Sequence, residues 1–142
     1  MRSERGQTTI FFTLILTGLL LLTAVGIEIG RIVYARGEVG KAADAAALAA
    51  VAQIDVAHYR ETGEIRFLPN VYVIAQNYAT RNSTYLQSRH IEVTVTDIYV
   101  RADRRVVFVT ISADLSSLMP GILPFDGIYS ITGYAQARLQ GR

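Results

Sequence analysis

Cysteine is absent from this 142-residue chain, so a disulfide framework and thiolate chemistry are excluded. A strong excess of charge is absent too, because 14 basic and 12 acidic residues leave a net charge of +2. This balance argues against a nucleic-acid partner. Glycine-rich phosphate loops are also missing. No proline occurs before Pro69, so helical periodicity can continue through the first half of the chain.

No group of residues has the spacing of an active site. His58 and His90 lie 32 residues apart, without cysteine or clustered carboxylates that would complete a metal site. Ser88 and His90 could be combined with Asp97 as a nucleophilic triad, but no nucleophile elbow accompanies them. The sequence therefore predicts a protein that is not an enzyme and that uses no cofactor and no metal.

The most distinctive segment is an apolar run near the N-terminus. Gln7–Ile27 holds 21 residues without a charge and, as a helix, would be about 31 Å long. A bilayer core is about 30 Å thick, so the run predicts a membrane span. A cleaved secretory signal is one alternative, although its apolar region is usually shorter. A buried core helix is another, although so small a remainder could not surround a helix that is apolar on all sides.

Small residues continue beyond this span, where the helix is expected to run to about His58. Gly26 and Gly30 form a GxxxG pair, and Lys41–Ala52 contains eight alanines in twelve residues. Such a surface permits close approach of another helix. The predicted helix-packing residues are Gly26, Gly30, Ala43, Ala46 and Ala50. The alternative is that alanine simply has the highest helix propensity.

Charges near the end of the span need partners. Glu28 lies between Ile27 and Ile29, where a carboxylate is costly unless it is paired or reaches the interface. Arg31 lies at i+3, so the sequence predicts a Glu28–Arg31 charge pair. An ordinary charge at the headgroup level is the alternative. Asp44 similarly could reach Lys41, or could belong to a solvated face.

The C-terminal part predicts a small α+β unit. Asn70 is a candidate N-cap for a helix that ends near Arg81–Ser83. Period-2 alternation then predicts three antiparallel strands. They comprise residues 91–101, with a turn at Ala102–Arg104, then Val106–Ala113, and Ile128 to about Leu139, after a break at Pro120, Gly121, Pro124 and Gly127. The expected divisions are a basic leader at 1–6, a long helix at 7–58 and an extracytoplasmic domain at 59–142.

Residues 5–52 resemble TadE/TadG-like proteins of Tad (Flp pilus) systems. The resemblance rests on an ordered set: Arg5-Gly6, the apolar run, "GIEIGRIVYAR" at Gly26–Arg36 and "AADAAALAA" at Ala42–Ala50. The family usually has aspartate where this chain has Glu28, so the charge is kept. The resemblance implies an accessory or minor-pilin-like component of a surface filament, related to type IV pilins.

The resemblance also raises the question of whether the N-terminal leader is cleaved. Pilin-type leaders end in glycine, which makes Gly6–Gln7 the candidate processing site. The glutamate usually found five residues after the cut is replaced by Phe11. A cut would leave a new terminal charge without that partner, at a cost of several kcal/mol if it is desolvated. We therefore expect residues 1–6 to stay attached, and the intact mass of the membrane-extracted chain checks this.

The expected location is the cytoplasmic membrane, as a single-pass protein with its C-terminal domain outside, or a cell-surface filament. Basic residues flank both ends of the span, so their distribution does not decide orientation, and the resemblance favours a cytoplasmic N-terminus. Expected partners are the membrane and other pilin-like or Tad proteins, with self-association also open. The alternative function is a membrane-anchored extracytoplasmic binding or sensor domain unrelated to a filament.

Overall fold

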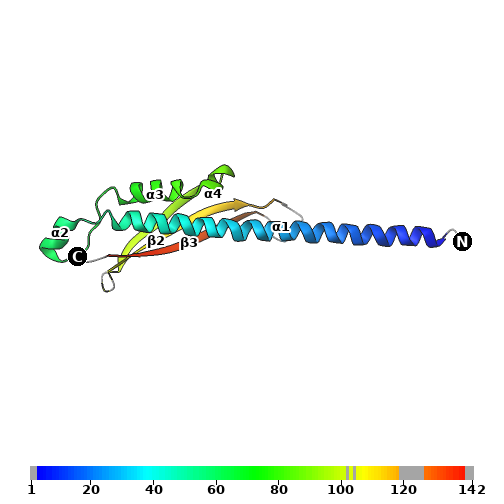
Figure 1. Cartoon of the computed structure of the whole chain (residues 1–142), viewed down its shortest axis with the longest axis horizontal. Coiled ribbons are helices and arrows are strands. Elements are labelled where there is room, and N and C mark those ends of the chain that lie inside the picture. Colours follow the sequence, from blue (N-terminus) through cyan, green and yellow to red (C-terminus); the bar gives the residue numbers. More distant parts are fainter. Residues whose placement is uncertain (1–2, 102, 104, 119–126, 140–142) are drawn as a thin grey trace. The chain divides into compact units, whose positions relative to one another are not determined.

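The computed structural model describes residues 3–101, 103, 105–118 and 127–139, with side chains from residue 7 onward. The chain divides into two units, Met1–Val33 and Tyr34–Arg142. The elements follow the order helix α1, short helices α2 to α4, and strands β1 to β3 (Figure 1). The expected α+β class, with a long N-terminal helix and a three-stranded antiparallel sheet, is confirmed.

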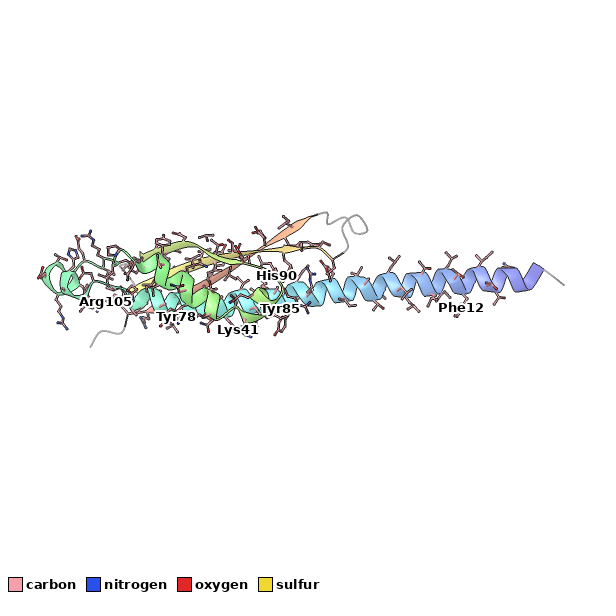
Figure 2. All side chains as sticks on the ribbon, turned by 90° about the horizontal axis from the view of Figure 1, so that it is seen from above. Phe12, Lys41, Tyr78, Tyr85, His90 and Arg105 are labelled. Atoms are coloured by element: carbon pink, nitrogen blue, oxygen red, sulfur yellow. The ribbon has the colours of Figure 1, made fainter. Side chains whose placement is uncertain are left out.

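Helix α1 runs from Ser3 to Val51. Threonines inside its apolar part donate their hydroxyls to the carbonyl four residues earlier, as in Thr13 to Thr9 at 2.9 Å and Thr17 to Thr13 at 2.8 Å. These bonds leave the hydroxyls satisfied without water. Apolar side chains around this part are exposed, including Phe12, which Figure 2 labels. The helix contains a stretch that is long and apolar enough to cross a membrane by length and composition.

The long helix is shorter than the sequence suggested. It ends at Val51 and not near His58, and a separate helix α2 follows at Val56–Thr62. The chain turns because Asp55 caps α2, accepting a hydrogen bond from the His58 N–H at 3.0 Å. The intervening segment also pairs with a later one through the Ile54–Phe67 bridge. Helix α2 then ends at Gly63, which adopts the left-handed conformation with φ of 75°.

Helix α3 at Val71–Arg81 confirms the expected helix, with Asn70 at its N-cap position but without a side-chain capping bond. Helix α3 ends within the expected range, and a further short helix that was not predicted, α4 at Thr84–Ser88, follows it. Leu86 of α4 is fully buried, so this short element contributes to the core.

The sheet has the order β1-β2-β3, with both pairs antiparallel. Its strands span Val93–Arg101, Val106–Ser116 and Ile128–Arg138. The β1–β2 register shifts between Val95 and Asp97, so Thr96 is an extra residue and alternation changes phase there. The expected turn at Ala102–Arg104 lies partly outside the described residues, and the expected break at Pro120, Gly121 and Pro124 lies wholly outside them.

The described helices cover one face of the sheet. Along β2, alternate residues are buried: Val107, Val109, Ile111, Ala113 and Leu115. Figures 1 and 2 show α3, α4 and the C-terminal part of α1 on the same face of the sheet. Helix α1 contacts α4 through Tyr34 and Tyr85, whose rings meet edge to face at 4.5 Å between centroids. Antiparallel sheets commonly cover one face in this way.

Candidate functional site

The C-terminal part of α1 is the hydrophobic centre of the Tyr34–Arg142 unit. Its buried residues are mostly alanine: Ala35, Ala42, Ala43, Ala46, Ala47, Ala49 and Ala50. Val39 is also fully buried, and an added Cβ on Gly133 of β3 would lie 2.8 Å from its Cγ1 atom. Small side chains therefore let the helix backbone approach the sheet. The opposite, exposed stripe is formed by residues spaced three or four apart: Gly37, Lys41, Asp44 and Leu48.

The five predicted helix-packing residues fall into two groups. Ala43, Ala46 and Ala50 have no exposed surface, so within this chain they serve its own core. Gly26 and Gly30 are exposed, and apart from the adjacent backbone of α1 no atom of the described residues lies within 4 Å of a Cβ built on either. Packing against a helix of a second molecule remains a prediction. Of the five predicted residues, only Gly26 and Gly30 have exposed surface that such a helix could contact.

The predicted charge pair has its members close together. Arg31 Nε lies 3.9 Å from Glu28 Oε2, one helical turn away. The Glu28 side chain is only 3% exposed, whereas that of Arg31 is 20% exposed. A carboxylate withdrawn from water to this extent is stabilised by a nearby cation. The geometry therefore allows the pairing, while its role in assembly remains a prediction.

A second ion pair on α1 involves Lys41. Its ammonium donates a hydrogen bond to Glu38 Oε1 at 2.5 Å, and not to Asp44 as the sequence had allowed. This bond, together with the carboxylate charge, raises the pKa of Lys41 above its ordinary value of 10.5. A raised lysine pKa stabilises the folded chain below the unfolded pKa, and this contribution is lost as the pH rises through the folded pKa. Lys41 is exposed, so solvent screens the pair.

The candidate processing site lies inside the helix. Because α1 begins at Ser3, the backbone at Gly6 and Gln7 is helical, and the Gln7 side chain is exposed. Retention of residues 1–6 remains a prediction.

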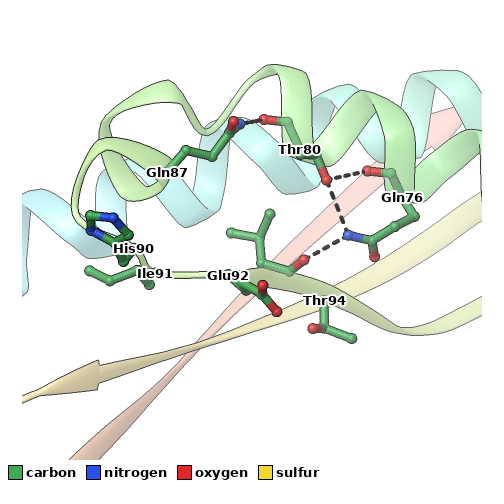
Figure 3. A pocket seen from close by; sticks show the side chains of 8 residues that line it. Gln76, Thr80, Gln87, His90, Ile91, Glu92 and Thr94 are labelled. Atoms are coloured by element: carbon green, nitrogen blue, oxygen red, sulfur yellow. Dashed lines mark hydrogen bonds between the residues drawn. The ribbon is translucent and has the colours of Figure 1, made fainter.

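A cavity of about 500 Å³ lies beside strand β1 (Figure 3). Its lining residues are Gln76, Thr80, Gln87, His90, Ile91, Glu92, Val93 and Thr94. Gln76 donates to the Val93 carbonyl at 2.7 Å and accepts from the Val95 N–H at 2.8 Å. Across the described ranges, no group of three or more His, Asp or Glu residues has metal-binding geometry. Within this cavity, the Gln76 amide connects α3 to strand β1.

Residues 6–53 match the family model described as "Putative Flp pilus-assembly TadE/G-like". The match confirms the resemblance stated for residues 5–52, and this segment is similar to the family. It coincides almost entirely with α1. It indicates a pilus-related role, and the apolar helix fits membrane anchoring. No curated protein and no solved structure matches the chain.

Sequence reasoning missed two close contacts. Gly133 lies in a strand, where glycine often marks a close backbone approach, so this position could have been identified. The double hydrogen bond of Gln76 had no comparable signal, because a glutamine on a helix surface is commonplace. Its partners lie 17 and 19 residues further along the chain.

Proposed function

We propose that this chain is a non-enzymatic structural or assembly component of a Tad or type IV pilus-like surface filament. It is anchored by the apolar part of α1 as a single-pass protein of the cytoplasmic membrane. The observation that carries the proposal is the family match over residues 6–53. The most apolar 18-residue stretch of α1 supports membrane anchoring, since none of it is buried within the described chain. Exposed apolar side chains on all sides of a helix favour lipid or neighbouring helices over water.

The filament proposal is tested by deleting the chain in the cells that make it and counting surface filaments by electron microscopy. We expect filaments to be lost or much reduced, and restored by the wild-type chain. Normal filament number after deletion would overturn the proposal.

The proposed orientation places the N-terminus in the cytoplasm and the Tyr34–Arg142 unit outside. Because the chain has no cysteine, single cysteines can report the side of the membrane. Ser130→Cys is exposed on β3 and should react in intact cells with a maleimide that cannot cross the membrane. Labelling of this variant only after cell lysis would show that the Tyr34–Arg142 unit lies in the cytoplasm, which is the opposite of the proposed orientation.

In this proposal Gly26 and Gly30 allow a neighbouring helix to approach α1. Their exposure in the single chain supports this role, because a residue already buried could not provide the contact. Without large side chains, helix backbones can come close enough for extensive van der Waals contact within a membrane. The partner helix belongs to a pilin-like protein, another Tad component or a second copy.

The Glu28–Arg31 pair is proposed to set the register of packed helices. We expect Glu28→Gln to weaken assembly, because it removes the carboxylate charge beside Arg31. Glu28→Asp should be tolerated, since it keeps the charge and matches the residue usual in the family. Filament recovery at equal expression measures both effects. Equal behaviour of the two variants would identify Glu28 as a simple interface charge.

A further inference from the structure

The two edge strands of the sheet, β1 and β3, differ in whether side chains bond their outward backbone groups. Strand β1 is covered by side chains of α3, whose Gln76 amide bonds the Val93 carbonyl and the Val95 N–H. Further along, the Ile98 N–H donates to the Tyr72 hydroxyl at 3.3 Å. These side chains occupy backbone groups that an added strand would need. Together with the bulge at Thr96, they protect this edge against pairing.

Strand β3 forms the other edge, and its backbone geometry follows from its pairing with β2. The Leu139 N–H donates to the Arg105 carbonyl at 2.9 Å, and the Ser117 N–H donates to the Gly127 carbonyl at 3.1 Å. The register between these bonds is uninterrupted, so every second residue of β3 bonds to β2. The alternate residues direct their N–H and C=O groups outward: Ile128, Ser130, Thr132, Tyr134, Gln136 and Arg138.

No hydrogen bond from the described part of the chain reaches these outward groups. The strand also lacks the usual devices that discourage pairing. Between Ile128 and Arg138 it contains no proline, lysine or acidic residue, and its register with β2 shows no bulge. The outer edge of β3 is therefore a regular, eleven-residue template for strand addition.

A second copy of this chain fits this edge poorly. Symmetric antiparallel pairing of two β3 strands would make the two Tyr34–Val51 helical segments run in opposite directions, which copies anchored in one membrane cannot do. Continuing the sheet with both copies in the same direction would require the β1 edge. That edge is occupied by Gln76 and Tyr72.

Charge near the end of β3 indicates the chemistry of a different occupant. Arg105 and Arg138 line a cleft of about 690 Å³ together with Asp103, Val106, Gln136 and Leu139. Both arginines are exposed, and neither forms an ion pair with any residue that the structure describes. A carboxylate lying alongside Arg138 would be held by charge-assisted hydrogen bonds.

We propose that the outer edge of β3 accepts an extended segment of another protein, with an acidic residue of that segment beside Arg138. The added strand would bond to the outward N–H and C=O groups and extend the sheet to four strands. The backbone bonds supply the attachment and Arg138 supplies the preference for an acidic residue. This inference goes beyond the proposed filament function, and its preference for a foreign segment over a second copy rests on the proposed membrane anchoring.

The test uses the purified full chain in detergent and a fluorescent peptide, Glu-Thr-Val-Thr-Val-Thr-Val, as a generic antiparallel strand. We expect saturable binding by fluorescence anisotropy. A peptide N-methylated at every amide should bind at least about 10-fold more weakly, because neither of its edges can donate to β3. Equal binding of the two peptides, or no binding at millimolar concentration, would overturn the proposal.

Variants of the protein locate the site. Thr132→Pro removes an outward N–H that the β2–β3 ladder does not use, and should weaken binding about 10-fold or more. Thr132→Val keeps this N–H and should bind as the wild type does. Arg138→Gln should abolish the preference for the glutamate peptide over one with lysine in its place. Unchanged binding by a folded Thr132→Pro variant would contradict the assignment to β3.

The choice of occupant has its own control. Because the chain has no cysteine, Thr132→Cys can form a disulfide only with another copy or another protein. We expect no disulfide-linked dimer of this variant in membranes under mild oxidation. Efficient dimer formation would show that a second copy, and not a segment of another protein, occupies the β3 edge, and it would overturn the proposal.

Discussion

Replacement of Gly133 by valine is expected to lower the free energy of unfolding by about 3 kcal/mol. A Cβ at this position would lie 2.8 Å from the Val39 Cγ1 atom and 3.1 Å from the Val39 carbonyl oxygen. Val39 is fully buried, and its carbonyl belongs to a helix, so neither neighbour can move freely. Without this contact valine would favour the strand. Urea unfolding of the detergent-solubilised chain, followed by circular dichroism, measures the loss.

Two further substitutions separate the close contact from a general effect of losing glycine. Gly37→Ala changes an exposed glycine of α1 that has no described atom within 4 Å of its Cβ, and should stabilise the chain by about 1 kcal/mol. Combining Gly133→Ala with Val39→Ala should cost less than the sum of the two single losses, because the new methyl enters the space that Cγ1 leaves. Full stability of Gly133→Val would show that the helix and the sheet separate easily.

Gly30→Leu is expected to reduce assembly about 10-fold or more, equivalent to about 1.4 kcal/mol, while membrane insertion stays intact. Leucine favours insertion because it is more hydrophobic than glycine. It also blocks close approach of a neighbouring helix. No described atom lies within 4 Å of the added Cβ, so the fold of the single chain should be unaffected. Counting filaments and quantifying the chain in the membrane fraction distinguishes the two effects.

The matched control for this substitution is Ile29→Leu. Ile29 is a neighbouring exposed residue that already carries a large side chain, so this change adds no volume. It should leave both insertion and filament number at wild-type values. Normal assembly of Gly30→Leu would count against the proposed helix contact, as would an equal loss in both variants.

Local sequence patterns were sufficient for the type of each main element. The uncharged run Gln7–Ile27 and the following small residues predicted a long helix, and α1 confirms it. Alternating side chains predicted three antiparallel strands, and the second and third begin at Val106 and Ile128 as expected. These elements could be predicted because helical periodicity and the alternation of side chains along a strand arise from residues close together in the chain.

The boundary at Val51 depended on less local information. Periodicity permitted the helix to continue to His58, yet pairing of Ile54 with Phe67 and capping by Asp55 divide it. Helix propensity is a weak prior that such contacts override. The length of α1 was therefore decided by a segment more than ten residues further along the chain.

The sequence by itself determined that α1 has a small-residue surface and that its first part is apolar on all sides. Only the tertiary structure decided which small residues are used inside the chain: Ala43, Ala46 and Ala50 are buried there, while Gly26 and Gly30 remain exposed. It also decided that Gln76 covers the β1 edge of the sheet, whereas no hydrogen bond from the described residues reaches the outward groups of β3. The composition of a helix shows that its surface permits close packing. Which partner packs there depends on contacts between residues that are distant in the chain, and local periodicity does not encode those contacts.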